Sequence, residues 1–170
     1  MCGVGAVAIR AARPEDAEGL AEAWREFGRY YADIDPNEFR VPNEEGLADW
    51  FKSGLTEERP DDSLWLVAER DNRVIGFVRA QIWSPAEDAG RQILRETGEP
   101  VLKVDSISVR ETDRLQGVGS ALMSAAENWG RQRGATRAVV ISYANSPSSV
   151  PFYEDRMGYT RHTIGFLKSL

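Results

Sequence analysis

The 170-residue sequence is poor in cysteine, in histidine and in long apolar stretches, and each shortage excludes a class of protein. Cys2 is the single cysteine, so no intramolecular disulfide can form, and one cysteine with one histidine cannot build a His/Cys metal site. No apolar run approaches the roughly 20 residues of a membrane-spanning helix, and Met1–Arg10 lacks the regions of a signal peptide. We therefore expect a cytoplasmic protein with no metal and no membrane partner.

Basic residues are also outnumbered, since 21 lysines and arginines stand against 27 acidic residues and give a net charge of −6. A nucleic-acid binder needs basic surface to displace counterions, so we expect no nucleic-acid partner. A cationic ligand is the natural complement of an acidic protein, although net charge does not identify one. The length and the 42% apolar content fit one domain over residues 1–170.

The chain alternates strand-like and helix-like patterns, without repeats or a linker that would divide it. The expected strands are Gly5–Arg10, Leu64–Glu69, Val74–Trp83, Val101–Val109, Ala138–Tyr143 and Tyr159–Leu170. Helices are expected over residues 14–31, around 47–51, over Gly117–Arg133 and over Ser148–Met157. This order predicts an α/β fold with a mixed sheet rather than a purely parallel one.

Two local signals predict where elements end. Asp71-Asn72-Arg73 separates two strand patterns and predicts a tight hairpin, because Asp and Asn tolerate the positive φ that such turns require. Gly134 follows the amphipathic pattern of Gly117–Arg133 and predicts the left-handed cap that ends a helix.

The strongest functional signal is the segment Arg114–Ser120, which follows a predicted strand and runs into a predicted helix. The first N–H groups of a helix lack intrahelical partners and lie at the positive end of its dipole, so a loop there can hold an anion. Gly117 and Gly119 remove side chains where the backbone would approach phosphate oxygens, and Arg114 adds positive charge. A plain strand–loop–helix junction also uses such glycines, so the segment alone leaves both interpretations open.

The sequence R-L-Q-G-V-G in this segment resembles the Q/R-x-x-G-x-G/A signature of the GNAT N-acetyltransferases, and it stands between the fourth strand and the third long helix, as in that family. Asn145, then P-F-Y-E from Pro151 and M-G-Y from Met157, resemble the family's N…fYe…lGF ending. The resemblance extends to individual motifs over about Val101–Tyr159. In the first half of the chain it is limited to the pattern of strands and helices. It implies the GNAT fold: a mixed central sheet of about six to seven strands, flanked by about four helices and splayed between strands four and five.

The resemblance also implies an acetyl-CoA-dependent N-acetyltransferase, in which a primary amine attacks the acetyl donor directly in a ternary complex. It assigns cofactor binding to Ile107, Ser108 and Val109 along the pantetheine arm, to Arg114, Leu115, Gln116, Gly117, Val118, Gly119 and Ser120 at the pyrophosphate, and to Asn145, Ser148 and Tyr153 nearby. The N–H of Val109 would polarise the thioester carbonyl. Tyr153 would be the general acid for the departing thiol, and Asp105, acting through water, the base.

Several alternatives remain open at this point. Tyr153 lies eight residues after Asn145, whereas seven is commoner in the family, so Ser146 is the alternative to Asn145. The ring of Tyr153 also suits a core position, and Asp105 also suits a solvated or N–H-capping role. The acids between the first two helices can be solvated or can bind an amine; they are Asp33, Asp35, Glu38, Glu44 and Glu45.

The function itself has two rivals. A non-catalytic acyl-CoA-binding module would need the Arg114–Ser120 loop but neither Asp105 nor Tyr153. An acyltransferase that uses a longer acyl group would differ only in the space beside the thioester. The acceptor can be a small-molecule or a peptide amine, and the chain can act as a monomer or a homodimer.

Overall fold

The computed structural model describes residues 6–57, 60–94 and 98–168. Cys2, Gly5 and Leu170, which enter the sequence predictions, lie outside these residues. Five strands form one sheet in the order β1-β2-β3-β4-β5. Their bounds are β1 Ala8–Ala11, β2 Ser63–Arg70, β3 Arg73–Trp83, β4 Val101–Val109 and β5 Arg137–Val140. The first four strands are antiparallel and β5 runs parallel to β4, so the sheet is mixed, as predicted.

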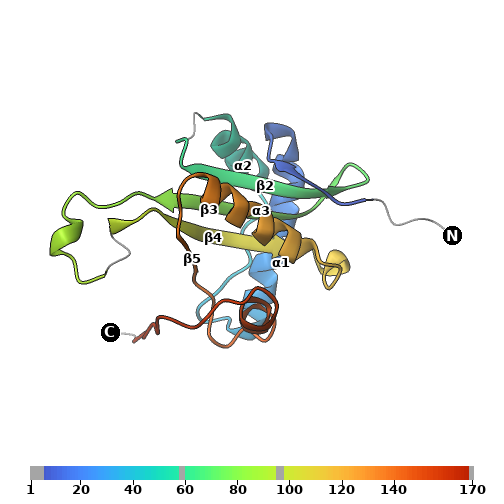
Figure 1. Cartoon of the computed structure of the whole chain (residues 1–170). Helices are drawn as coiled ribbons and strands as arrows, with labels where there is room; N and C mark the ends of the chain where they lie inside the picture. The colour runs from blue at the N-terminus through green and yellow to red at the C-terminus, as the bar shows by residue number, and fades with distance from the viewer. Residues whose placement is uncertain (1–5, 58–59, 95–97, 169–170) are drawn as a thin grey trace.

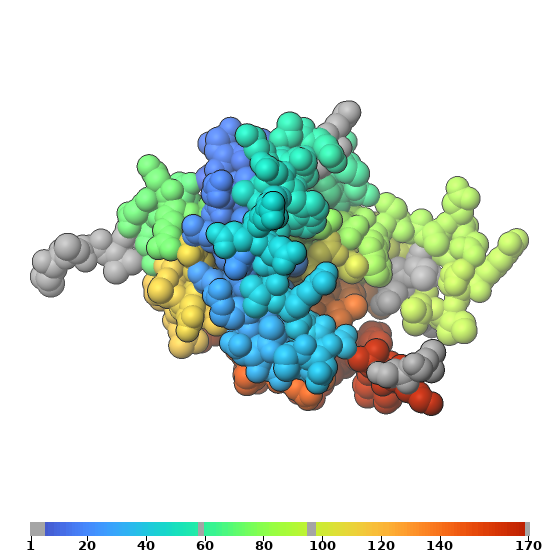
Figure 2. Space-filling view, turned by 180° about the vertical axis from the view of Figure 1, so that it is seen from behind, coloured from blue at the N-terminus to red at the C-terminus, as the bar shows by residue number. Residues whose placement is uncertain are grey.

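The helices lie on both faces of this sheet (Figure 1). Their bounds are α1 Ala17–Ile34, α2 Leu47–Thr56, α3 Val118–Gln132 and α4 Ser149–Pro151, with 3₁₀ turns η1 Pro14–Asp16, η2 Ala89–Arg91 and η4 Glu111–Asp113 and a π-helical turn, η5, at Phe152–Arg156. In Figure 1, α3 crosses the near face and α1 lies behind the sheet. Figure 2 shows the opposite side, where the chain from α1 to α2 covers the middle of the molecule. Among the helices described, none has the length and apolar character to span a membrane.

Alternation along the strands divides the core into two layers. Val78 and its neighbours of the same parity pack with Leu122 of α3 in one cluster. Phe77, the next residue along β3, packs instead with Leu20 of α1 and Phe51 of α2. The sheet therefore separates an α3 face from an α1/α2 face. The alternation holds along β3 from Phe77 to Ile82, whereas Val74 and Ile75, next to the hairpin, have the reverse assignment.

Both local signals at element ends are confirmed. Asp71 and Asn72 have φ values of 51° and 59°, so both central residues of the β2–β3 turn are left-handed, as a two-residue hairpin requires. Gly134 has φ 80°, and the Ala135 N–H donates to the Gly130 carbonyl, which closes the last turn of α3.

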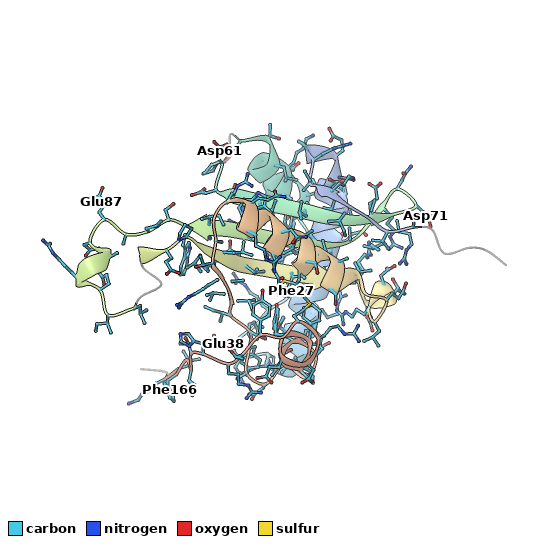
Figure 3. The ribbon with its side chains drawn as sticks, in the orientation of Figure 1. Phe27, Glu38, Asp61, Asp71, Glu87 and Phe166 are labelled. Carbon is cyan, nitrogen blue, oxygen red and sulfur yellow. The ribbon has the colours of Figure 1, made fainter. Side chains whose placement is uncertain are left out.

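The prediction of six to seven strands is wrong, since the described residues form five. The strand expected at Tyr159–Leu170 is absent, because the described residues up to Lys168 find no neighbouring strand to bond with, and an unpaired strand is not stable alone. The Phe166 side chain is 94% exposed and lies clear of the sheet (Figure 3). The strand expected to reach Tyr143 ends at Val140, where its pairing with β4 ends. The helix expected over Ser148–Met157 is the short α4 followed by η5.

Strands β4 and β5 pair over only four residues each. The parallel register runs from Val101 opposite Arg137 to Val104 opposite Val140, and it stops there. Strand β4 continues to Val109 with β3 on its other side. Its β5-side edge is therefore without a strand partner over the last five residues, which is where the predicted splay between strands four and five falls.

Candidate active site

The loop that joins β4 to α3 carries two left-handed residues. Leu115 has φ 60° and Gly117 has φ 82°. A left-handed non-glycine residue costs roughly 1–2 kcal/mol, and such strain gathers at ligand clamps and active sites. Gly117 is the N-cap of α3, and no side chain caps the helix there. The first N–H groups of α3 are thus left for another acceptor, which is the arrangement that binds an anion.

Arg114 is positioned at this loop by two contacts. Its Nε donates to the Val109 carbonyl oxygen at 3.1 Å, and its guanidinium carbon lies 5.3 Å from the centre of the Tyr30 ring on α1. Among the described residues, no carboxylate pairs with Arg114. Its positive charge is therefore held beside the α3 N-terminus without being neutralised.

The two glycines of the loop serve different purposes. A Cβ on Gly117 would meet nothing within 4 Å, so glycine is favoured there by its positive φ. A Cβ on Gly119 would lie 3.4 Å from two atoms of the Phe152 ring, so this glycine lets η5 pack closely on α3. The sequence interpretation gave both glycines to phosphate approach, and Gly119 in addition lies in contact with the Phe152 ring.

Tyr30 links Arg114 to two of the predicted residues, Ser146 and Ser148, but not to Asn145. The Tyr30 hydroxyl lies 3.0 Å from Ser146 Oγ and 2.6 Å from Ser148 Oγ. Ser146 is buried, whereas Asn145 is exposed and its amide makes only a long contact of 3.5 Å, to the Tyr143 hydroxyl. Of the two residues left open by the spacing, Ser146 is the one joined to this network. Tyr30 itself gave no sequence signal beyond its place within the helix expected over residues 14–31.

Tyr153 lies in η5 and packs with aromatic neighbours. Its ring centre is 5.2 Å from that of Phe152 and 5.9 Å from that of Tyr159, and it lies against the α3-face core. Burial raises the pKa of the Tyr153 hydroxyl. That hydroxyl has no hydrogen-bond partner among the described residues. The surroundings fit the core role, and they leave the hydroxyl available to a ligand.

Asp105 lies on the α1/α2 face and is well partnered. Gln81 Nε2 donates to both of its oxygens, at 3.0 and 2.9 Å, and Lys103 Nζ lies 3.2 Å from Oδ1. Its side chain is 17% exposed. Asp105 is therefore neither a solvated acid nor an N–H cap, and proton transfer to it requires one of these bonds to give way.

Two of the five predicted acids, Asp35 and Glu44, have partners in the segment between α1 and α2, and a third, Asp33, lies within α1. The Tyr143 hydroxyl donates to Asp35 at 2.7 Å and holds the pKa of that carboxyl below its ordinary value. Glu44 pairs with Arg25 at 3.0 Å, beside a hollow of about 490 Å³ lined by Arg25 and residues 41–45. A second hollow, of about 350 Å³, is lined by residues 87, 88, 90 and 91. No residue of the Arg114–Ser120 loop lines either hollow.

No group of three or more His, Cys, Asp or Glu side chains is placed to hold a metal ion within the part of the chain that the structure describes. The candidate site consists of the β4–α3 loop with Arg114, the edge of β4 up to Val109 that has no strand partner, and Tyr153 of η5. Asp105 belongs to the same strand, β4, but lies on its α1/α2 face, whereas Tyr153 packs against the α3-face core.

Comparison with solved structures places this fold among known ones. A transcriptional regulator from Bacillus halodurans C-125 is 18% identical with a TM-score of 0.72, covering 97% of this chain and 100% of that chain. The aminoglycoside N-acetyltransferase AAC(6')-Iy in complex with CoA is 16% identical with a TM-score of 0.68, covering 99% and 98%. The aminoglycoside acetyltransferase meta-AAC0020 from an uncultured soil metagenomic sample, in complex with sisomicin, is 15% identical with a TM-score of 0.64, covering 96% of each chain.

At these identities the solved structures establish the fold alone. No curated protein sequence matches the chain significantly. The sequence profile of the Acetyltransferase (GNAT) family, however, matches residues 20–159, which include most of α1, the strands from β2 to β5, the Arg114–Ser120 loop and Tyr159. The chain therefore belongs to the acetyltransferase (GNAT) family.

Proposed function

We propose that this protein transfers an acetyl group from acetyl-CoA to a primary amine by direct attack in a ternary complex. The observation that carries the proposal is the Arg114–Ser120 loop, with its two left-handed residues, its uncapped helix N-terminus and its unpaired arginine. Membership of the acetyltransferase family supports it, as does the CoA held by an aminoglycoside N-acetyltransferase of the same fold.

The residues present fit the cofactor. The amides from Leu115 to Ser120 would hold the pyrophosphate, and Arg114 would add charge to the same oxygens. Ser120 Oγ is buried without a hydrogen-bond partner among the described residues, and a phosphate oxygen is one partner that would satisfy it. The free edge of β4 over Ile107–Val109 would pair with the amides of the pantetheine arm, with Ser148 close to Arg114 through Tyr30.

Acetyl-CoA supplies an acetyl group activated as a thioester. The acceptor ammonium, with a pKa near 10, must lose its proton to become a nucleophile, and Asp105 acting through water is the base that we propose. Asp105 lies four residues before Val109 on β4, roughly 10–13 Å along the strand, so more than one water molecule would relay the proton to a carboxylate that Gln81 also contacts. The N–H of Val109 would polarise the thioester carbonyl, and Tyr153 would return a proton to the sulfur that leaves. The carbon–nitrogen bond thus forms as the carbon–sulfur bond breaks, and the second proton that nitrogen loses would restore the Tyr153 hydroxyl.

The direct test is thiol release from acetyl-CoA with a panel of primary amines. Release that depends on the amine, together with the matching N-acetyl product, is the expected result. Parallel reactions with propionyl-CoA and butyryl-CoA measure the preferred acyl length. Tight acetyl-CoA binding by calorimetry with no release from any amine would instead favour a non-catalytic acyl-CoA-binding module.

A further inference from the structure

Six side chains from three strands form a cluster on the α1/α2 face of the sheet. We call it the sheet-face cluster, and its members are Trp65 of β2, Arg79, Gln81 and Trp83 of β3, and Lys103 and Asp105 of β4. The register places Trp65 opposite Arg79 and Gln81 opposite Lys103. Phe51 of α2 contacts Trp65, with ring centres 5.9 Å apart. Trp65 therefore lies at the border between the part of the sheet that α2 covers and the rest of the cluster.

Each cation of the cluster is held against an indole ring. The guanidinium carbon of Arg79 lies 5.0 Å from the centre of the Trp65 ring, and Lys103 Nζ lies 4.8 Å from that of Trp83. The Arg79 side chain is 46% exposed and Trp83 is 48% exposed. Stacking of this kind orients a cation while leaving its N–H groups open to another partner. The cluster thus presents oriented positive charge to solvent.

The charges of the cluster do not cancel. Asp105 is its single carboxylate, and Gln81 occupies both oxygens while Lys103 Nζ lies 3.2 Å away. Arg79 is the more distant partner, with Nε 3.9 Å from Oδ2. Two cations and one carboxylate leave one positive charge in excess, and it resides on the exposed Arg79. This local excess is opposite in sign to the net charge of −6 on the whole chain.

The cluster lies along β4 before the proposed point of reaction. Arg79 is opposite Ser106, three residues before Val109, which corresponds to about 10 Å at a rise of about 3.3 Å per residue. The α3 face of β4 is covered by packed apolar side chains, with Val104 of β4 in the same cluster as Leu122 of α3. An acceptor that reaches Val109 from the α1/α2 face therefore lies along the stretch of β4 that Arg79 borders.

We propose that the acceptor is a primary amine that also carries a carboxylate, about 7–10 Å from the nitrogen, and that Arg79 binds this carboxylate. The proposal rests on the proposed acetyl transfer and names its substrate class. It replaces the cationic acceptor expected from net charge, because a polyamine would meet excess positive charge at this position. Trp65 holds the guanidinium in place, so that the carboxylate fixes the distance of the amine from the thioester.

Matched acceptors test the proposal. They are 8-aminooctanoate and 6-aminohexanoate, which carry the distal carboxylate, hexylamine, which lacks it, and 1,6-diaminohexane, which has a cation in its place. We expect kcat/KM for an aminocarboxylate to exceed that for hexylamine and the diamine by about tenfold or more, mainly through KM, and to fall with added salt. Arg79→Gln should remove this preference, and Arg79→Lys should keep part of it. Arg131→Gln, which removes an exposed arginine of α3 on the other face, should leave it unchanged.

The outcomes separate the two proposals. Equal rates for all four amines, a preference for the diamine, or a preference that survives Arg79→Gln in folded protein would overturn the anionic acceptor while leaving acetyl transfer intact. If no amine is acetylated, the proposed activity fails, and calorimetry of 8-aminooctanoate with wild-type and Arg79→Gln protein still decides the binding claim. Binding that Arg79→Gln weakens about tenfold supports it, and absent or unaltered binding overturns it. Melting temperatures of the variants establish that each is folded.

Discussion

The guanidinium group of Arg114 stacks on the ring of Tyr30 at 5.3 Å while its Nε donates to the carbonyl of Val109. One side chain thereby joins α1, the end of β4 and the loop before α3. The Tyr30 hydroxyl also contacts the hydroxyl groups of Ser146 and Ser148. The loop before α3 is therefore supported by α1, which packs on the other face of the sheet.

Removing the Tyr30 ring should weaken acetyl-CoA binding. Tyr30→Leu takes away the platform of Arg114, and we expect Kd to rise about two- to fivefold, which is the size of an exposed cation–π contact. Tyr30→Phe keeps the ring and loses the bonds to Ser146 and Ser148, so it should lower Tm and leave Kd nearly unchanged. Calorimetry with both variants checks this, and an equal rise in Kd for Phe and Leu would contradict it.

Substitutions at the two loop glycines should differ in kind. Gly117→Ala has room for its methyl group but must keep φ near 82°, so we expect about 1 kcal/mol lower stability and weaker acetyl-CoA binding as the loop relaxes. Gly119→Val presses on Phe152 and should destabilise by about 1–3 kcal/mol through overpacking. Denaturant unfolding and calorimetry on each variant separate the effects. A Gly119→Val protein as stable as the wild type would show that the contact with Phe152 is not tight.

Asp105→Asn tests the proposed base. The change keeps the size of the side chain and removes its basicity, so we expect kcat/KM to fall by about 10²–10³ and its pH profile to move to higher pH. The Kd for acetyl-CoA should hardly change, because Asp105 lies outside the Arg114–Ser120 loop that we propose binds the pyrophosphate. The measurement is a pH series with one accepted amine, and an unchanged profile would leave Asp105 as the partner of Gln81 and Lys103 alone.

Tyr153 calls for a pair of variants. Since burial raises the pKa of its hydroxyl, proton donation to a thiol with a pKa near 8.5 is less favourable than for an ordinary tyrosine, and we expect Tyr153→Phe to lower kcat by only about tenfold. Tyr153→Ala should also lower Tm, because it removes the ring that packs with Phe152 and Tyr159. A fully active Phe variant beside an unstable Ala variant would make Tyr153 a packing residue.

The ion pair of Arg10 and Asp16 predicts a pH dependence of stability. Burial raises the pKa of Asp16, but two 2.7 Å bonds from Arg10 and one of 2.8 Å from the Arg13 N–H outweigh it, so the pKa lies below its ordinary value of 3.8. A carboxyl with a lowered folded-state pKa stabilises the fold above the unfolded value and loses that contribution as pH falls through the folded value. We expect Asp16→Asn to cost about 2–4 kcal/mol at pH 7 and progressively less below pH 4. Urea unfolding at a series of pH values measures both, and a constant difference down to pH 2 would contradict the assignment.

Features that depend on neighbours in the chain could be predicted from the sequence. Asp71-Asn72 forms the left-handed turn and Gly134 caps α3, because both follow from the conformations that single residues tolerate. The loop from Arg114 to Ser120 could be located for the same reason, since it needs only a strand before it and a helix after it. The prediction of a last strand at Tyr159–Leu170 was wrong, because a segment with apolar residues such as Phe166 forms a strand only when a neighbouring strand is within reach. The presence of that neighbour is not a local property of the sequence.

The sequence by itself indicated the family, through motifs that resemble its signatures. It also predicted the order of elements up to Met157 and the position of the Arg114–Ser120 loop, because periodicity and turn chemistry act over a few residues. The tertiary structure alone decided which distant side chains meet. It placed Tyr30 under Arg114, Phe152 against Gly119, and Gln81 and Lys103 on Asp105. Those contacts depend on the register of the sheet and the packing of helices on its two faces, and long-range register is set by the whole core rather than by any one segment.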